Sequence, residues 1–193
     1  MRTKNIVLLI GLFLCASSAA AQTRFYDQTH TFHENGFTYQ ADLTSGGFVM
    51  LYNKDAGRFI QHHLQAHRDG RGISEVDRER YLDAEEESSI IMRSLGHQIV
   101  RNGFSAEEKN RLKRGEILWF TLIICPDTGS VKEVHFEFRP DSGYGTIPVS
   151  TYRQIELELK DRIRFTPTDF GRSLNFIYRG WSIDVKMPQL ELF

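Results

Sequence analysis

Residues 116–124 read Glu-Ile-Leu-Trp-Phe-Thr-Leu-Ile-Ile, and this run decides the fold. It is apolar at odd and even positions alike, rich in β-branched and aromatic side chains, and too short to span a membrane. The pattern predicts a central strand with both faces covered. Proline, aspartate and glycine follow within residues 125–130, which is a turn signal. Residues 132–138 then alternate apolar and polar side chains, so they predict a second strand that forms a hairpin with the first.

The second strand has two different faces. Its apolar face carries Val134, Phe136 and Phe138, and its polar face, which we expect to be wet, carries Glu133, His135 and Glu137. After a loop, Thr151 and Gln154 match a capping box at the start of a helix. The apolar stripe of that helix is Tyr152, Ile155, Leu159 and Ile163. This stripe suits packing on the apolar face of the hairpin.

A return strand is expected over residues 174–186. Phe165-Thr166-Pro167 ends the helix, since proline disfavours the α region for the residue before it. Apolar side chains then occupy even positions up to Tyr178 and odd positions from Trp181 onward. The change of parity predicts a β-bulge at Arg179-Gly180.

These residues carry a family resemblance. The strand start at Gly115-Glu116-Ile117, the Pro-Asp-Thr-Gly-Ser-Val turn from Pro126, and the Phe-x-Pro at Phe165 are similar to the TonB C-terminal-like domain over residues 112–186. The resemblance implies a C-terminal antiparallel sheet of β-β-α-β type. It also implies binding of a short peptide of an outer-membrane transporter by addition of a strand to the sheet edge. The whole chain resembles an uncharacterised family of secreted bacterial proteins.

The resemblance places a peptide-binding edge on the return strand, whose apolar side chains are Leu174, Phe176, Tyr178, Trp181 and Ile183. A long apolar strand with a free edge would otherwise favour aggregation. We therefore expect an exported non-catalytic binding or scaffold protein that captures an extended peptide of an envelope protein. A structural component of an envelope complex, or a homodimer through the same edge, fits the sequence equally well, so the oligomeric state stays open.

Residues 1–21 predict a secretory signal peptide. Arg2 and Lys4 form a basic start, an apolar core follows, and small residues end at Ala21. Export to the periplasm is therefore expected, with the cell surface or the medium as alternatives. The apolar run is about half of the roughly 20 residues that a membrane span needs, so we expect no transmembrane segment after cleavage.

The charge and cysteine content exclude several roles. Removal of residues 1–21 leaves 22 basic and 25 acidic residues, a formal charge of −3 that gives no basic field for nucleic acid. Cys125 is then the one remaining cysteine, so no intrachain disulfide is possible, and we expect its thiol to be buried and inert. No cofactor-binding motif is recognised, and none of the common catalytic motifs occurs, which favours a non-catalytic protein.

The N-terminal part, residues 22–104, completes an α+β fold. Turn signals at Asn35-Gly36 and Gly46-Gly47 flank two apolar runs and predict a β-hairpin. We expect this hairpin to cover the strand at residues 116–124, so that it forms one integrated unit with residues 105–193. Residues 90–103 predict a helix that Gly103 ends, and Ser105 with Glu108 predicts a capping box for the next helix.

A metal-binding alternative depends on His63 and His67. Their i, i+4 spacing within residues 58–69 would place both on one helical face, as in paired zinc ligands. No third ligand is identifiable from spacing, and a solvated polar patch is the competing interpretation. The alternative function is a metal-dependent hydrolase or a metal-binding protein. The acidic run at residues 75–87 lacks the pattern of a calcium loop and predicts a solvated helix face or a loop.

Overall fold

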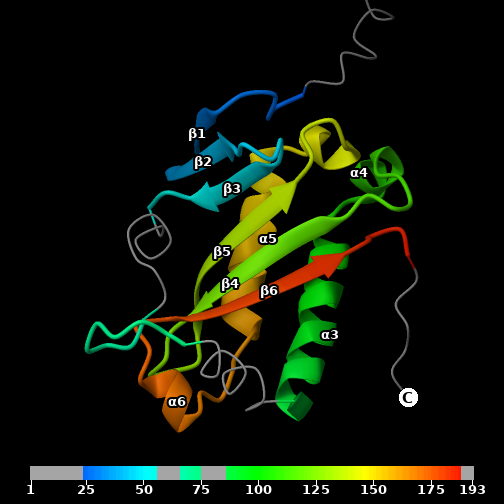
Figure 1. The fold of residues 1–193 in the computed structure, drawn as a ribbon. Helices are drawn as coiled ribbons and strands as arrows, with labels where there is room; N and C mark the ends of the chain where they lie inside the picture. Colours follow the sequence, from blue (N-terminus) through cyan, green and yellow to red (C-terminus); the bar gives the residue numbers. More distant parts are fainter. Residues whose placement is uncertain (1–23, 56–65, 75–85, 188–193) are drawn as a thin grey trace, which may run out of the picture.

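The computed structural model describes residues 24–55, 66–74 and 86–187 (Figure 1). Within these ranges the strands are β1 (His30–Glu34), β2 (Phe37–Leu43), β3 (Val49–Asn53), β4 (Leu118–Ile124), β5 (Val131–Phe138) and β6 (Ile177–Ile183). The α-helices are α3 (Glu86–Gly103), α4 (Ala106–Arg111), α5 (Val149–Arg162) and α6 (Asp169–Arg172), and η2 (Gly143–Thr146) is a 3-10 helix. The α+β class is confirmed.

The described strands form one antiparallel sheet in the order β1-β2-β3-β5-β4-β6. The predicted hairpin is confirmed, because β4 and β5 pair across the turn at residues 125–130, where Gly129 has φ +67°. The N-terminal strands are also confirmed, with Asn35 and Gly36 both at positive φ in the turn between β1 and β2. Such a two-residue turn matches the twist of the strands that it joins.

The N-terminal strands add to the width of the sheet and do not cover either of its faces. β3 pairs with β5 from Val49–Phe138 to Tyr52–His135, so the expectation that the hairpin covers residues 116–124 is wrong. With β4 on one side of β5, its other edge still needs backbone partners, and β3 supplies them. In consequence β4 is not covered on both faces, and Trp119 is 40% exposed.

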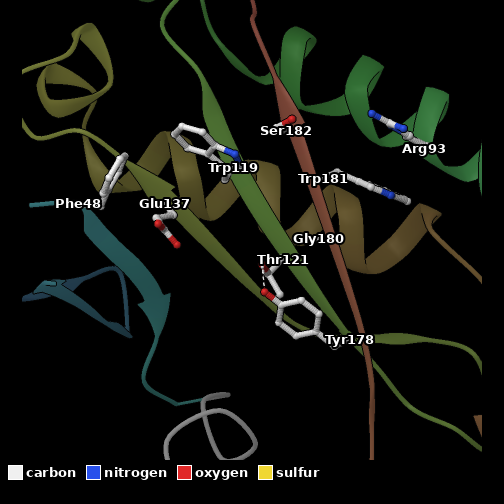
Figure 2. Close-up of a pocket in the computed structure, with 9 residues that line it drawn as sticks. All are labelled: Phe48, Arg93, Trp119, Thr121, Glu137, Tyr178, Gly180, Trp181 and Ser182. Atoms are coloured by element: carbon white, nitrogen blue, oxygen red, sulfur yellow. Dashed lines mark hydrogen bonds between the residues drawn. The ribbon is translucent and has the colours of Figure 1, made fainter. Parts of the chain in front are cut away.

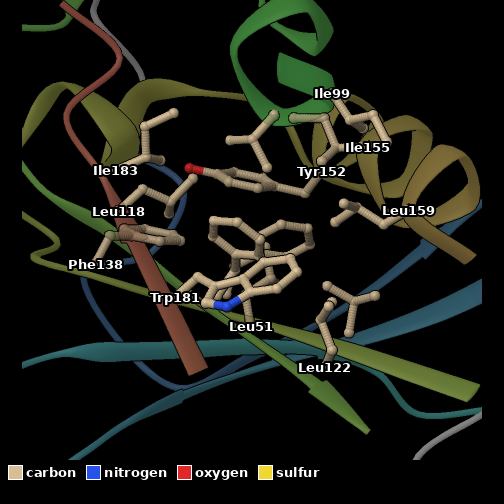
Figure 3. Close-up of a cluster of buried hydrophobic side chains, with 14 of the residues drawn as sticks. Leu51, Ile99, Leu118, Leu122, Phe138, Tyr152, Ile155, Leu159, Trp181 and Ile183 are labelled. Atoms are coloured by element: carbon tan, nitrogen blue, oxygen red, sulfur yellow. The ribbon is translucent and has the colours of Figure 1, made fainter. Parts of the chain in front are cut away.

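Both long helices lie on the same face of the sheet (Figure 1). The predicted stripe of α5 is confirmed, since Tyr152, Ile155, Leu159 and Ile163 are fully buried. Directly opposed residues on this face form the core row Ala41, Leu51, Phe136, Phe120 and Trp181. Figure 3 shows the side chains of α5 and α3 packed against those of the strands. The core thus occupies one side of the sheet.

Two local predictions about the later strands are wrong. β6 pairs with β4 in an unbroken register from Ile177 to Ile183, without the predicted bulge at Arg179-Gly180. The apolar side chains change from even to odd positions because Leu174 and Phe176 precede the strand. They are buried there without belonging to the alternation of faces along β6. The register shift of this region lies instead between β4 and β5, at Ile123/Ile124.

The second wrong prediction concerns the polar face of β5. Glu133 and His135 are 2% and 5% exposed, so they are buried where a wet face was expected. His135 stacks on the ring of Tyr52 from β3 at 5.2 Å, and its Nε2 lies 3.4 Å from Glu133 Oε2. These contacts allow polar side chains to be buried. Only Glu137 is half-exposed.

Of the two predicted capping boxes, one is confirmed and the other is wrong. The box at Ser105 and Glu108 is confirmed on α4, with each side chain bonded to the other's backbone N–H. The box at Thr151 is wrong, because α5 begins after Pro148, and the Thr151 hydroxyl donates to Glu108 at 2.6 Å. Proline has no N–H and suits the start of a helix, so α5 begins earlier than the motif suggested.

Gly103 is the last residue of α3, so the predicted end of this helix is confirmed, but its φ is not positive. A Cβ built on it would lie 2.2 Å from Ile155 Cγ1 of α5. About two helical turns before Gly103, a Cβ built on Gly96 would lie 2.6 Å from the ring of Trp181. The two glycines therefore allow α3 to approach α5 and β6 closely.

We expect Gly103→Ala to destabilise the protein by about 1–3 kcal/mol, because overpacking against Ile155 outweighs the better helix propensity of alanine. Urea unfolding measures this change in the free energy of unfolding. The matched control is Asn102→Ala, the exposed preceding position of α3, which should change stability by less than about 0.5 kcal/mol. A Gly103→Ala protein as stable as the wild type would contradict the close approach.

Candidate functional site

β6 is the last strand of the described sheet. Its residues from Ile177 to Ile183 pair with β4 on one side, and no strand of the described ranges pairs with it on the other. In an antiparallel edge strand, the N–H and C=O groups of alternate residues point outward. β6 therefore presents backbone donors and acceptors to a further strand.

The chain just before β6 has backbone partners on the side away from β4. Leu174 and Asn175 follow α6 and already have backbone partners in the segment around His67. Asn175 N–H donates to Ala66 O at 3.0 Å, and Arg68 N–H donates to Ser173 O at 2.8 Å. The part of the predicted edge near Leu174 is thus occupied.

A groove of about 410 Å³ crosses β6 at the level of Gly180 (Figure 2). Because Gly180 has no side chain, the groove connects the open face of the sheet to the side of α3. It is lined by Phe48, Arg93, Trp119, Thr121, Glu137, Tyr178, Gly180, Trp181 and Ser182. A surface that combines a free strand edge with a neighbouring groove can bind backbone and side chains of one extended ligand.

Aromatic side chains form the walls of the groove on the open face. Trp119 and Tyr178 are 40% and 46% exposed, which is unusual for rings of this size next to a core. Phe48 contacts Trp119 edge-to-face at 5.6 Å, and the Thr121 hydroxyl donates to the Tyr178 hydroxyl at 3.3 Å. Figure 2 shows Trp119 and Tyr178 on either side of Gly180.

The residues of the predicted edge have different positions. Tyr178 lines the groove, and Trp181 lines it from the helix side, where it contacts Phe120 at 5.7 Å. Leu174, Phe176 and Ile183 are buried. Sequence reasoning missed Phe48, Arg93, Trp119 and Glu137, because these positions lie on three separate elements or within an apolar run that predicted core.

The two histidines of the metal hypothesis are not brought together by the described structure. His63 lies outside the described residues. His67 Nδ1 lies 3.0 Å from the Ser173 hydroxyl, and the ring contacts Phe170 at 5.3 Å. In the described ranges no three His, Cys, Asp or Glu side chains are grouped for a metal ion. The metal-binding alternative stays a prediction.

Cys125 is half-buried instead of buried. It lines a pocket of about 200 Å³ together with Arg68 and Lys132. Desolvation raises the pKa of the thiol. Hydrogen bonds from Thr128 and Asp127 and the charge of Lys132 together lower the pKa by more than desolvation raises it, so the pKa lies below the ordinary value of a cysteine. Cys125 thus differs from the buried thiol that its place beside an apolar strand predicted.

A polar row crosses the sheet on the face opposite the helices. Its directly opposed members are Thr31, Gln40, Tyr52, His135, Thr121 and Gly180. The Thr31 hydroxyl donates to Gln40 Oε1 at 2.6 Å, and the Tyr52 hydroxyl donates to Asp42 Oδ2 at 2.9 Å. Since each bond joins neighbouring strands, the row helps to fix their register. It ends at the groove.

Glu156 of α5 is fully buried and joins the helix to β2. It accepts a short hydrogen bond from the Tyr39 hydroxyl, and pairs with Arg153 at 2.9 Å and Lys160 at 3.3 Å. Burial raises the pKa of Glu156 from 4.5 to about 7, and Lys160 lowers it in part. The carboxyl thus holds its proton in the folded state at pH values where it is ionised in the unfolded chain.

In the described residues, the fold and the groove define an α+β protein with one antiparallel sheet, two long helices on the same face, and an edge strand next to an aromatic groove. The chain belongs to the family described as Domain of unknown function (DUF5043), whose model matches residues 22–181. The crystal structure of a DUF5043 family protein from Bacteroides uniformis is similar, at 30% sequence identity and a TM-score of 0.65. The match covers 83% of this chain and 93% of that one.

No curated protein matches the chain. The resemblance to an uncharacterised family is thus confirmed, and the family carries no assigned activity. Among the helices that the structure describes, none has the length and apolar character to cross a membrane.

The pKa of Glu156 makes a prediction about pH and stability. Between about pH 4.5 and 7 the folded state binds more protons at this carboxyl than the unfolded state, so its contribution to stability falls as pH rises through that window. Glu156→Gln should remove this fall. The free energy of unfolding of the variant, relative to the wild type, should therefore rise by about 2–3 kcal/mol from pH 4.5 to pH 7.5.

The comparison uses the difference between the two proteins because His97 acts in the opposite direction. Burial, Arg93 and Arg101 lower the pKa of His97 to about 4, so its contribution to stability falls as pH drops from about 6.5 to 4. This effect is common to both proteins and cancels. Parallel stability curves over the whole range would show that Glu156 ionises normally.

Proposed function

We propose that this chain is an exported, non-catalytic binding protein of the bacterial envelope, and that it captures an extended peptide by adding a strand to β6. The observation that carries the proposal is the place of β6 as the last strand of the described sheet, directly beside the aromatic groove. Backbone hydrogen bonds to the edge would supply affinity, and the groove would select side chains.

The composition of β6 supports this use of the edge. Its sequence is Ile-Tyr-Arg-Gly-Trp-Ser-Ile, with Arg179 as the one charged residue and no proline. Proteins commonly protect an exposed edge with lysine, proline, a bulge or a covering loop. β6 is regular through all seven residues and carries none of the first three. An edge left in this state is suited to pairing with another chain.

The order of elements gives a second line of support. Apart from the short helices η2 and α6, the succession β4-β5-α5-β6 matches the β-β-α-β succession of the TonB C-terminal-like domain, which residues 112–186 resemble in sequence. In that family a peptide binds by strand addition at a sheet edge. The last strand of the unit is here also the edge strand, beside β4 and away from β3. The mode of binding is therefore available to this chain.

The test is selection of a displayed library of random linear peptides on purified residues 22–193. We expect enrichment of peptides that bind in an extended form. Proline is placed in β6 at Arg179 and, in a second variant, at Gly180. Because alternate residues point their N–H groups outward, one of the two substitutions spares the hydrogen bonds to β4 and blocks the free edge.

The informative variant is the one that unfolds cooperatively near the wild-type temperature. It should lose binding of the selected peptides by about tenfold or more, which corresponds to about 1.4 kcal/mol. A matched control is Asn102→Ala on the exposed side of α3, which should bind as the wild type does. Unchanged binding to both folded proline variants, or no enrichment at all, would refute strand addition at β6.

A further inference from the structure

The open face of the sheet carries an exposed indole with a polar group on each flank. Trp119 of β4 is directly opposed to Glu137 of β5 on one side and to Ser182 of β6 on the other. The Cβ atoms of directly opposed residues lie about 4.5–5.5 Å apart, and their side chains share one face of the sheet. A molecule that lies on the indole is therefore within reach of a carboxylate on one flank and a hydroxyl on the other.

Phe48 holds this indole in position. The two rings contact each other at 5.6 Å with an interplanar angle of 85°, so Phe48 supports Trp119 without stacking parallel on it. Trp119 remains 40% exposed. A large ring that is already fixed loses little conformational freedom when a ligand binds to it.

A second exposed ring lies further along the same face. Tyr178 is 46% exposed, and its hydroxyl accepts a hydrogen bond from the Thr121 hydroxyl at 3.3 Å. Its Cε1 atom lies 3.7 Å from a Cβ built on Gly180, so the ring covers the strand at the glycine. Trp119 and Tyr178 lie on either side of Thr121 and Gly180 (Figure 2). Two separate rings on one face suit a ligand that is itself made of more than one ring.

The polar groups of the groove are of complementary kinds. The Glu137 carboxylate only accepts hydrogen bonds, the Arg93 guanidinium only donates them, and the Ser182 hydroxyl does both. Within the described ranges these three side chains make no hydrogen bond or ion pair with the protein. Their hydrogen-bonding capacity is therefore available to a ligand. The groove volume of about 410 Å³ lies in the range of small-ligand sites, about 300–1,000 Å³.

The charges of the groove favour a neutral ligand. Glu137 on the open face repels an anion, and Arg93 beyond β6 repels a cation. A purely apolar ligand would remove water from the carboxylate without replacing its hydrogen bonds, which is costly. The ligand that meets none of these penalties is uncharged, carries hydroxyls, and has a flat apolar surface for the exposed rings.

A sugar ring in the pyranose form has this combination of properties. One face of the ring presents C–H bonds with partial positive charge, which stack favourably on the negative face of an aromatic ring. Its rim carries hydroxyls that both donate and accept hydrogen bonds.

We propose that the groove binds a short neutral oligosaccharide, with one sugar ring on Trp119 and hydroxyls of that ring bonded to Glu137 and Ser182. A neighbouring sugar ring then lies toward Tyr178. The inference goes beyond the proposed function, because this site uses side chains on the open face and needs no backbone pairing with β6.

The experiment uses Trp119 as its own reporter in purified residues 22–193. This chain contains two tryptophans, of which Trp119 is 40% exposed and Trp181 is 6% exposed. The probes are neutral trisaccharides of glucose, galactose, mannose, xylose and N-acetylglucosamine. We expect at least one of them to bind in calorimetric titration, and at saturation to reduce the quenching of tryptophan fluorescence by acrylamide.

Two substitutions test the geometry of the site with the trisaccharide that binds best. Trp119→Leu keeps an apolar side chain but removes the flat ring, so binding should weaken by about tenfold or more. Trp119→Phe keeps a smaller ring and should bind with intermediate affinity, which preserves the test if Trp119→Leu does not fold. Glu137→Gln replaces the charged acceptor and should weaken binding about fivefold, because hydrogen bonds to charged groups are the stronger ones.

The matched controls are Leu157→Ala, at an exposed apolar position of α5, and Glu107→Gln, at an exposed position of α4. Both should bind the trisaccharide as the wild type does. Absence of binding by all five probes would overturn the inference. Wild-type affinity in both folded Trp119 variants, or acrylamide quenching that the bound sugar leaves unchanged, would also overturn it. None of these results bears on peptide selection at β6, so the proposed function is tested separately.

Discussion

Tyr152 of α5 is the contact on which the rest of the structure depends. Its ring stacks on Phe138 at 5.3 Å and lies 5.1 Å from Phe136, so it attaches the helix to β5. The same ring contacts Tyr26 near the N-terminal end of the described chain and Phe104 after α3. Its hydroxyl donates to Tyr144 O at 3.0 Å. One fully buried aromatic side chain thus joins α5 to β5, to the N-terminal end of the described chain and to the residue after α3, and its hydroxyl remains satisfied.

Packing on one side of the sheet has a structural consequence for the other. Since α3 and α5 cover the same face, the aromatic and aliphatic core lies there, and the opposite face carries the polar row. Burial of Glu133 and His135 on that face is possible because their neighbours from β3 and β5 supply stacking and hydrogen bonds. Gly180 interrupts the side chains of the row at its end, and the groove opens at this point.

The position of the N-terminal strands determines which strand ends the described sheet on the other side. β3 pairs with β5, so β1, β2 and β3 widen the sheet on the side away from β6. Had the same strands covered β4 or paired with β6, the groove between Trp119 and Tyr178 would be filled. The segment around Ala66 pairs with the chain just before β6, where the Asn175 N–H donates to Ala66 O. Access to the candidate site is therefore a property of the whole topology.

The sequence by itself determined the hairpin of β4 and β5, the buried stripe of α5, the N-terminal strands and their turns, and the membership of an uncharacterised family. Each of these follows from periodicity or from turn residues within a few positions, which is local information. The sequence did not determine the role of Trp119. An apolar run predicts buried side chains on both faces of a strand, whether or not another element covers the second face. The tertiary structure alone decided the register of β6, the pairing of β3 with β5, and the meeting of Phe48, Arg93, Glu137 and Gly180. Contacts between distant segments depend on which strand edges and helix faces still lack partners after the local elements have formed.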